Sequence, residues 1–228
     1  MGATARAHKG LAMEGFIAEW YARNTGRDFR RFQAAARAVA ERTPAGGRVL
    51  EVAPGPGYLA VELARRGFDV TGLDLSRSFV DIASRNAAAA GVAARFEHGD
   101  AAHLPFPDAS FDFVVCMAAF KNFTDPLGAL DEMHRVLRPG GAASVMDLRR
   151  DASPDAIAEE VRGMNLSPVN AALTRWTFRW MLLPRAWDRS TLEDLARRSR
   201  FGGGELVEVG IGWDLRLLRP DSPTAPGV

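Results

Sequence analysis

Residues 48–60 constrain the fold of this chain more than any other segment. The apolar run at residues 48–52 carries one carboxylate, Glu51, and leads into the turn Ala53-Pro54-Gly55-Pro56-Gly57. Residues 58–66 then show the apolar spacing of an amphipathic helix. The pattern predicts a strand, a tight turn and a helix start. Such a turn exposes main-chain N–H groups, which a ligand can reach without obstruction by side chains.

Two cofactor chemistries share this kind of turn. Gly55-x-Gly57-x-x-Ala60 fits the fingerprint of dinucleotide-binding folds, and Asp74 lies about where the ribose-binding acid of that fingerprint falls. Read from Glu51, the same residues resemble the glycine-rich loop of class I S-adenosylmethionine-dependent methyltransferases, with an alanine in place of the first glycine. The turn alone does not distinguish the two chemistries, so the rest of the chain has to do so.

Composition describes an ordinary globular chain. Of the 228 residues, 47% are hydrophobic and 25% are charged, so we expect one domain with a sizeable core. The net charge of +1 gives no support to a nucleic-acid partner. Cys116 is the single cysteine and the four histidines lack H-x-x-x-H spacing, so neither an internal disulfide nor a metal site is expected. With no signal-peptide pattern and no apolar run of bilayer length, we expect a cytoplasmic protein without a membrane partner.

Strands and helices alternate through the centre of the chain. We expect strands at residues 48–52, 69–73, 94–98, 111–117 and 142–147, and helices at 58–66, 76–90 and 126–137. Ser76 is the expected N-cap of the second of these helices. The alternation is typical of a mostly parallel sheet with right-handed crossovers.

Helical segments flank this alternating core. Residues 10–43 have the spacing of two helices, and two more are expected at 154–165 and 168–183. The capping box Ser190-Thr-Leu-Glu193 predicts a further helix, followed by two strands at 205–210 and 213–218. We therefore divide the chain into an N-terminal helical lid (1–47), a main domain (48–219) with a helical insertion at about 154–188, and a disordered tail (220–228).

Four expected strands end in an acid, at the edge where open parallel sheets bind their ligands. Glu51 either takes part in a cofactor site or braces the loop. Asp74 can accept hydrogen bonds from two ribose hydroxyls, or cap a helix. Asp100 and the amide of the next residue can bind an adenine ring, or the aspartate simply closes a turn. Asp147 either lines an acceptor site or pairs with a neighbouring arginine, Arg149 or Arg150.

A set of motifs in this order resembles the class I S-adenosylmethionine-dependent methyltransferases, particularly the small-molecule group of ubiquinone and menaquinone synthesis. The resemblance covers residues 48–147 and rests on the glycine turn, Val70-Thr-Gly-Leu-Asp74, Glu97-His-Gly-Asp100-Ala, Leu104-Pro-Phe-Pro-Asp-Ala-Ser-Phe-Asp112 and Arg135-Val-Leu-Arg-Pro-Gly-Gly141. It implies an α/β, Rossmann-like sheet of seven strands, mostly parallel with the last strand antiparallel. Helices would cover both faces, and the added N-terminal and post-strand-5 helices would form a lid.

The resemblance also implies a cofactor site for S-adenosylmethionine, which leaves as S-adenosylhomocysteine. The glycine turn would cradle the methionine part, Asp74 the ribose and Asp100 the adenine, with the backbone after the fourth strand near the sulfonium. The residues expected at the cofactor are Glu51, Ala53, Gly55, Gly57, Tyr58, Asp74, Leu75, Asp100, Ala101, Ala102, Cys116 and Met117. A methyl at Ala53 is tolerable where φ stays negative.

The acceptor is expected next to residues 117–123, where relatives often carry one or two histidines. Lys121 stands there and would orient an anionic or phenolic acceptor, act as a base, or simply face solvent. Asn122 would bind the acceptor or cap the following helix. By the resemblance, Tyr21 would lie near the sulfonium. The remaining residues expected at the acceptor are Trp20, Phe120, Asp147, Trp176 and Trp180, and Phe178 and Met181 would belong to the same aromatic roof or to the core of the added helices.

Together these features predict methyl transfer to a small aromatic or heteroaromatic acceptor. The transfer would be directed to oxygen or nitrogen, by in-line displacement, and catalysed mainly by positioning. One alternative is a nicotinamide-dependent reductase, which would need a second nucleotide-binding half and a Tyr-x-x-x-Lys motif, and the chain shows neither. Another is a cofactor-binding relative without catalysis. The apolar face of residues 173–183 also allows a homodimer.

Overall fold

A computed structural model describes residues 14–25, 29–164 and 166–221, without the side chains at positions 20, 21 and 23–25. Residues 1–13 and residues 222–228, which make up most of the tail expected at 220–228, therefore lie outside the described part. Within the described part, no helix is both long and apolar enough to cross a membrane.

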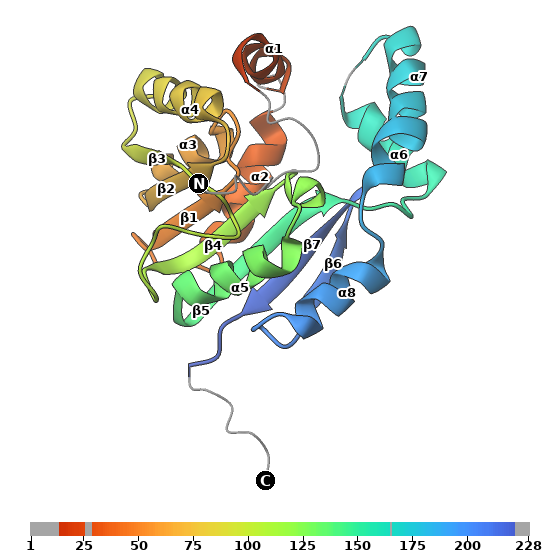
Figure 1. The fold of residues 1–228 in the computed structure, drawn as a ribbon. Helices are drawn as coiled ribbons and strands as arrows, with labels where there is room; N and C mark the ends of the chain where they lie inside the picture. The colour runs from red at the N-terminus through yellow and green to blue at the C-terminus, as the bar shows by residue number, and fades with distance from the viewer. Residues whose placement is uncertain (1–13, 26–28, 165, 222–228) are drawn as a thin grey trace, which may run out of the picture.

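A seven-stranded sheet forms the centre of the molecule (Figure 1), with the strand order β3-β2-β1-β4-β5-β7-β6. The first five strands pair in parallel, and β7 runs antiparallel to both of its neighbours. The expected mostly parallel sheet with an antiparallel last strand is thus confirmed. The strands are β1 (Arg48–Val52), β2 (Asp69–Asp74), β3 (Ala94–His98), β4 (Phe111–Met117), β5 (Leu137–Leu148), β6 (Glu205–Val209) and β7 (Gly212–Leu218).

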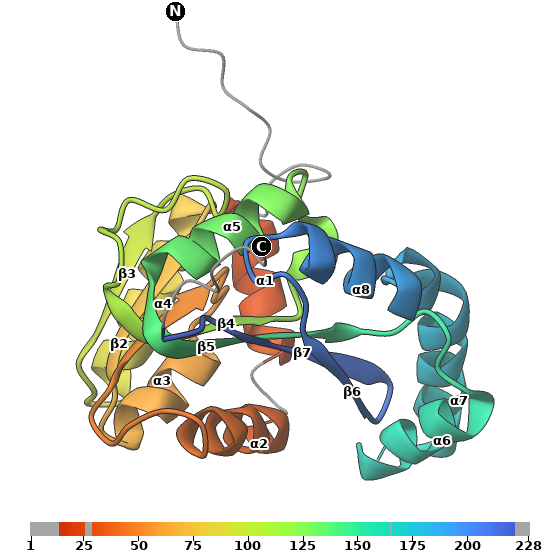
Figure 2. The same ribbon diagram turned by 90° about the horizontal axis from the view of Figure 1, so that it is seen from below.

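Helices cover both faces of the sheet (Figures 1 and 2). On one face lie α2 (Phe29–Ala40), α3 (Tyr58–Arg65) and α4 (Arg77–Ala89), and on the other lie α5 (Pro126–Val136) and α8 (Arg189–Arg198). Strand β4 explains why both layers are needed. Phe113 and Val115 pack in the cluster with α2 and α3, whereas Val114 and Cys116 pack in the cluster with α5 and α8. A central strand buried on both faces has to be apolar at nearly every position.

The remaining helices stand at the edge of the sheet where the parallel strands end (Figure 1). They are α1 (Gly15–Thr25), α6 (Pro154–Gly163) and α7 (Pro168–Thr177), and α7 continues into the π-helical turn η2 (Phe178–Leu182) and the 3-10 turn η3 (Leu183–Arg185). Of the two expected N-terminal lid helices, α2 is instead part of the helical layer, because Phe32, Ala36 and Val39 are buried against α3. Of these two N-terminal helices, α1 alone stands at the edge where the parallel strands end (Figure 1).

Two helix starts show how local patterns fared. Ser76 caps α4 as expected, since its hydroxyl accepts a hydrogen bond from the amide of Phe79 at 3.1 Å. The expected cap at Ser190 is wrong, because Asp188 caps α8 by accepting from the amide of Thr191 at 2.9 Å. Ser190 donates to the same carboxylate at 2.9 Å. The helix thus begins two residues earlier than expected, with a charged acceptor at its N-terminus.

Two other expected boundaries also shift. Strand β5 begins at Leu137 and runs through the Arg-Pro-Gly-Gly segment that was expected to separate helix from strand, with a register irregularity opposite Phe111 and Phe113. The helix expected at 168–183 ends at Thr177 and changes to π-helical geometry, which often marks a functional site.

Candidate functional site

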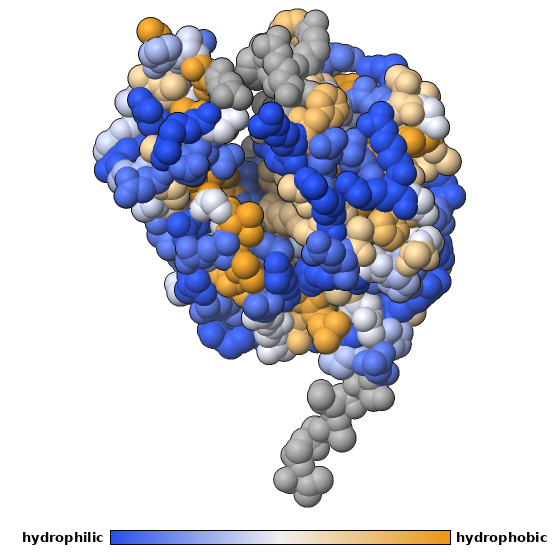
Figure 3. Space-filling view, turned by 180° about the vertical axis from the view of Figure 1, so that it is seen from behind, coloured by the Kyte–Doolittle hydropathy of each residue, from blue (hydrophilic) through white to orange (hydrophobic). Residues whose placement is uncertain are grey.

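The topology places a crevice between β1 and β4. Strands β2 and β3 lie on one side of β1, and the chain then returns to place β4 on its other side. Ligands of open α/β sheets bind at such a reversal, beyond the carboxyl ends of the strands. A cavity of about 480 Å³ lies at this place, bounded by the loops after β1 to β4 and by α2, β5 and η2. The space-filling view shows the surface hollowed near its centre (Figure 3).

The turn after β1 has a left-handed backbone at three positions. Ala53 has φ +56°, Gly55 +54° and Gly57 +78°. The condition named for a tolerable methyl, a negative φ at Ala53, is therefore not met, and the amide of Ala53 donates to the carbonyl of Leu73 at 2.8 Å. Ala53 and Gly55 line the cavity. Gly57 does not, and a Cβ there would meet Ala83 at 2.8 Å, so this glycine permits close packing of α3 on α4.

Asp74 joins this turn to the end of β2. One carboxylate oxygen accepts from the amide of Gly55 at 2.9 Å, and the other accepts from the amide of Ser76 at 2.9 Å. Burial raises the pKa of this carboxyl, and the two amide donors act against that rise. Each oxygen keeps a further lone pair, and the residue lines the cavity. It can therefore brace the loop and still accept from a vicinal diol.

Glu51 has a buried carboxyl group that lines the same cavity. It is 3% exposed, and its Oε2 atom has no hydrogen-bond partner in the protein. Burial raises the pKa of Glu51 to about 8, against a backbone hydrogen bond from Ala60 that lowers it. A buried acceptor without a donor is costly in an otherwise well-paired interior. A cationic or N–H group of a ligand in this cavity would satisfy it.

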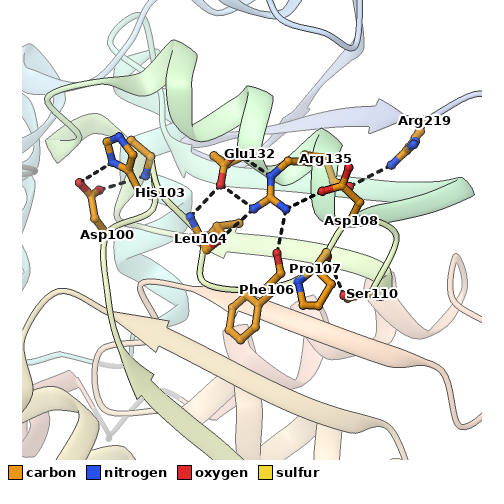
Figure 4. Close-up of polar contacts among 11 residues, drawn as sticks. Asp100, His103, Leu104, Phe106, Pro107, Asp108, Ser110, Glu132, Arg135 and Arg219 are labelled. Atoms are coloured by element: carbon orange, nitrogen blue, oxygen red, sulfur yellow. Dashed lines mark hydrogen bonds and ion pairs between the residues drawn. The ribbon is translucent and has the colours of Figure 1, made fainter.

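Asp100 lies in the loop that follows β3 (Figure 4). Its carboxylate accepts from the amide of Ala102 at 3.0 Å, and its second oxygen lies 3.3 Å from Nδ1 of His103. The aspartate therefore does close a turn, and it lines the cavity as well. Leu75 and Ala101 also line the cavity, whereas Ala102 does not and contributes only its amide to the turn.

Arg135 on α5 fixes the remainder of this loop (Figure 4). Its guanidinium donates to the carbonyls of Leu104 and Phe106 at 2.9 and 2.7 Å, and to the carboxylates of Glu132 and Asp108 at 2.7 and 2.8 Å. Glu132 in turn accepts from the amide of Leu104 at 2.8 Å. Hydrogen bonding to Arg135 lowers the pKa of Glu132 and that of Asp108. Two sequence motifs are thus one structural unit, since the loop of the first is held by the arginine of the second.

The end of β4 separates site residues from core residues. Met117 and Ala118 line the cavity, and Ala118 has a left-handed backbone with φ +60°. The side chain of Cys116 is buried in the core, where burial raises the pKa of its thiol. Phe120 was expected to border the acceptor but is fully buried, packs edge to face on Phe123 at 5.4 Å and does not line the cavity. The 3-10 turn η1 (Phe120–Asn122) points this ring inward.

Lys121 and Asp147 form a buried ion pair beside the cavity. The ammonium donates to the carboxylate at 3.0 Å and to the carbonyl of Ala118 at 2.9 Å, and the other oxygen of Asp147 accepts from the backbone amide of Lys121 at 2.9 Å. Of the three roles considered for Lys121, that of a lysine that simply faces solvent is therefore wrong. It lines the cavity, whereas Asp147 lies behind it. An ammonium held in this way suits orientation of an anionic group better than proton abstraction.

The alternatives for Asp147 and Asn122 are also resolved. Neither arginine pairs with Asp147, because Arg149 pairs with Glu208 and Arg150 with Asp188. Asn122 does not cap the following helix, whose cap is Asp125. It lines the cavity instead.

The aromatic roof differs in part from expectation. Phe178 and Leu182 of η2 line the cavity together with Phe123. Trp176 and Trp180 do not, and they are 53% and 62% exposed on another face of the same helical segment. These two are corrections, because helical spacing cannot say which of two apolar faces meets the sheet.

Tyr58 lines the cavity from α3 and ties the N-terminal helix to it. Its hydroxyl donates to the carbonyl of Ala22 on α1 at 2.8 Å, and its ring packs on Phe32 with centroids 5.5 Å apart. The backbone of α1 includes Trp20 and Tyr21, whose side chains lie outside the described part, so their expected roles stay predictions.

The cavity residues that were not expected from the sequence include Arg31, Phe123, Leu148 and Leu182. Arg31 stacks over Phe32, with its guanidinium carbon 4.7 Å from the ring centroid, and brings a cation to the side of the glycine turn. Phe123 had a signal, because it closes the same segment as Lys121. The described residues contain no group of three histidine, cysteine, aspartate or glutamate side chains placed to hold a metal.

Known proteins match this arrangement. Residues 50–145 match the family described as a methyltransferase domain. A demethylmenaquinone methyltransferase of Deinococcus radiodurans is 44% identical over 108 residues, which are 46% of this chain and 45% of that protein. A ubiquinone/menaquinone biosynthesis C-methyltransferase of Geotalea daltonii is 35% identical over 106 residues, 44% of this chain and 45% of that one. Among solved structures, an S-adenosylmethionine-dependent methyltransferase of Aquifex aeolicus superposes with a TM-score of 0.68 over 88% of this chain and 97% of its own, at 16% identity.

Fold and site thus define the Rossmann-like class I methyltransferase fold. The match of residues 50–145 to a methyltransferase domain and the shared fold confirm the resemblance expected from the sequence, and S-adenosylmethionine stays the expected cofactor. The chain spans about half the length of the curated relatives it matches. It covers 45% of the Deinococcus radiodurans protein and 56% of a demethylmenaquinone methyltransferase of Thermus thermophilus.

Proposed function

We propose that this protein transfers a methyl group from S-adenosylmethionine to a planar aromatic acceptor that carries a hydroxyl or amino group. One observation carries the proposal. A single cavity joins three acidic strand ends, at Glu51, Asp74 and Asp100, to an apolar wall that includes Phe123 and Phe178. The acids match the polar groups of the cofactor, and the wall matches a flat, apolar partner.

The chemistry of the acidic side fits the cofactor residue by residue. Asp74 would accept from the ribose hydroxyls through its free lone pairs. Asp100 would accept from the adenine amino group, and the orphan Oε2 of Glu51 would meet the cationic end. Arg31 supplies a cation for the carboxylate of the methionine part. The open space in front of Gly55, where a Cβ would meet nothing within 4 Å, leaves the backbone of the turn accessible.

The opposite wall supports an aromatic acceptor. Phe123, Phe178 and Leu182 offer apolar surface, and Lys121 and Asn122 offer N–H donors beside it. An acceptor oxygen that gains negative charge as its proton leaves would be stabilised by the Lys121 ammonium. Asp147 holds that ammonium in place from behind, so the orientation of the charge is fixed before the acceptor binds.

The protein's share of the reaction is alignment and exclusion of water. The bound cofactor supplies an electrophilic methyl carbon with a good leaving group. The acceptor forms a bond to that carbon as the sulfur–carbon bond breaks, and it loses one proton to solvent. In-line geometry of this kind contributes much of the rate in two-substrate reactions. The paired Lys121 has no free lone pair to take the proton, so acceptors with an acidic hydroxyl are favoured.

The most specific part of the proposal concerns the acceptor atom that receives the methyl group. The name of the Geotalea daltonii relative specifies methylation at carbon, and an electron-rich hydroxylated ring is nucleophilic at ring carbons as well as at oxygen. Reduced naphthoquinones and simple phenols are therefore the first acceptors to test, with anilines for nitrogen. Release of S-adenosylhomocysteine identifies an acceptor, and mass spectrometry of the product separates carbon from oxygen or nitrogen methylation.

Cofactor variants separate the proposal from its alternatives. Asp74→Ala and Asp100→Ala should each abolish measurable binding of S-adenosylhomocysteine, and Asp81→Ala, which alters an exposed carboxylate on α4, should not. Cofactor binding without turnover on every hydroxylated or amino-substituted ring would contradict the catalytic part. Binding of NADH instead would favour the reductase.

A further inference from the structure

Helix α7 and the turn η2 carry an apolar face that the rest of the described protein leaves uncovered. Val169, Leu173, Trp176 and Trp180 are 78%, 60%, 53% and 62% exposed. Their spacing of four, three and four residues places them along one side of the helix. No residue of α7 is fully buried. Monomeric proteins rarely leave a continuous stripe of this kind, with two tryptophans, in contact with water.

Charge distinguishes this segment from the remainder of the chain. Residues 161–187 contain four arginines and no aspartate or glutamate, whereas the whole chain has 29 basic and 28 acidic residues. Arg162 pairs with Glu159. Arg175, Arg179 and Arg185 are exposed and form no salt bridge with any residue that the structure describes. Cations therefore flank the apolar stripe without acidic partners of their own.

A groove continues this surface towards α6. It is open to solvent and is lined by Arg150, Arg179 and Trp180, with Pro154 and Ile157 at its base. The guanidinium of Arg179 lies over the ring of Trp180, 5.4 Å from its centroid. A tryptophan with an arginine beside it combines an apolar body with a cation, as side chains at a lipid–water boundary do.

The geometry points to an anionic phospholipid surface as the partner of this face. We propose that α7 and η2 lie in the headgroup region of a bilayer, with the stripe immersed and Arg175, Arg179 and Arg185 at the phosphates. Helix α1 stands at the same edge of the sheet (Figure 1), and its Phe16 and Ile17 are 76% and 59% exposed. A peripheral contact of this kind needs no spanning helix.

The same segment also reaches the cavity. Phe178 and Leu182 lie on a different side of the helical turn from the stripe and line the cavity wall. A bilayer contact would therefore place the cavity wall next to lipid, where apolar aromatic molecules accumulate. The lipid contact itself does not rest on methyl transfer, and vesicle binding is measured without cofactor or acceptor.

Vesicle flotation tests the proposal directly. The full chain should bind vesicles of phosphatidylcholine and phosphatidylglycerol, with a blue shift of its tryptophan fluorescence, and should bind pure phosphatidylcholine much more weakly. The double variant Trp176→Gln/Trp180→Gln should lower the partition coefficient by about tenfold or more. Arg175→Gln/Arg179→Gln should lower it by about fivefold per arginine, and added salt should reduce the difference.

Matched controls alter exposed residues on other faces. Val209→Gln/Leu218→Gln removes two side chains that are each 60% exposed on the strands β6 and β7. Arg197→Gln/Arg198→Gln removes two exposed arginines of α8. Both controls should bind vesicles as the wild type does, and all variants should keep the wild-type affinity for S-adenosylhomocysteine and the wild-type circular dichroism.

Three results would overturn the proposal. One is a wild-type chain that binds neither vesicle. Another is binding that the tryptophan and arginine variants leave unchanged. The third is a concentration-dependent dimer, seen by sedimentation without vesicle binding and lost in Trp176→Gln/Trp180→Gln, which would assign the stripe to a second copy of this chain.

Discussion

The carboxylate of Asp74 accepts a hydrogen bond from the amide of Gly55 at 2.9 Å, and so joins the end of β2 to the turn after β1. The two strands are neighbours in register, with Val52 opposite Leu73. The hydrogen bond therefore sets the position of the turn relative to the end of β2. The same carboxylate that is proposed to bind the cofactor also shapes the loop that receives it.

Asp74→Asn tests this double role. An amide presents N–H to one of the two backbone donors, Gly55 or Ser76, so one native hydrogen bond is replaced by a clash of donors. We expect the free energy of unfolding to fall by about 1–3 kcal/mol and the affinity for S-adenosylhomocysteine to fall by at least tenfold. Chemical denaturation and calorimetry measure the two effects. The exposed carboxylate of Asp81 provides the control Asp81→Asn, and equal losses in both variants would refute the specific role.

Ala53→Gly should stabilise the protein. The left-handed backbone at Ala53 costs about 1–2 kcal/mol for a residue with a Cβ, and glycine adopts it without that cost but with a loss of about 0.5–1 kcal/mol in chain entropy. The expected net gain is of the order of 0.5–1 kcal/mol, seen as a higher denaturation midpoint. Ala34→Gly, at an exposed position inside α2, should instead lower stability by about 1 kcal/mol. A loss of stability at position 53 as well would show that its backbone is unstrained.

The pKa of Glu51, raised to about 8, predicts a pH dependence of stability. Between its ordinary value of 4.5 and about 8, the native protein keeps a proton that the unfolded chain has lost. The contribution of Glu51 to stability therefore falls as pH rises through this window, by on the order of 1 kcal/mol per pH unit. Glutamine does not titrate, so the contribution of this residue to the pH dependence of the unfolding free energy should vanish in Glu51→Gln. Relative to the wild type, the variant should therefore become more stable as the pH rises from about 5 to about 8. Parallel stability curves for the two proteins would contradict the assignment.

Arg135→Met tests the clamp on the loop that carries Asp100. It removes the donors to Leu104 and Phe106 and leaves Glu132 without its guanidinium partner, so we expect a loss of about 1–3 kcal/mol in unfolding free energy. Affinity for adenosine and S-adenosylhomocysteine should fall because the adenine-side loop loses its anchor. Arg138→Met is the matched control. Arg138 pairs with Asp112, which lies near the start of β4 and therefore at the edge of the sheet away from the cavity. A destabilised variant that binds both ligands normally would limit Arg135 to a structural role.

Lys121→Gln should affect the acceptor and spare the cofactor. Loss of the ammonium removes the stabilisation of an acceptor oxygen, so we expect kcat/KM for a phenolic acceptor to fall by about tenfold or more while the affinity for S-adenosylhomocysteine stays within about twofold. Lys121→Arg keeps a cation and should recover part of the activity. Equal losses in acceptor turnover and cofactor affinity would place Lys121 in the cofactor site instead.

Local patterns predicted the fold because they record local physics. The apolar run of β4 reflects burial on two faces, and Ser76 reflects an unsatisfied helix terminus, so both could be read without a structure. The pattern at Ser190 gave the wrong cap because Asp188, two residues earlier, is also a good N-cap residue and the helix begins just after it. The orientation of Phe120 depended on a short 3-10 turn, which leaves no periodic signal.

The part of the site that lies at or just after the ends of the parallel strands could be predicted from the sequence. Glu51, Asp74 and Asp100 lie at the cavity because parallel strands end at one edge. The pair of Lys121 with Asp147 joins residues 26 positions apart, and the sequence offered Arg149 and Arg150 as nearer partners. Trp176 and Trp180 were placed on the wrong face because a helix with apolar residues on two sides has no unique inward side.

Titration of S-adenosylhomocysteine into the wild-type chain tests the central claim most directly. We predict saturable binding at one site with a dissociation constant between about 1 µM and 1 mM, no binding of NADH, and no measurable binding to Asp74→Ala. No heat with either form of the cofactor, or saturable binding of NADH in its place, would contradict the account.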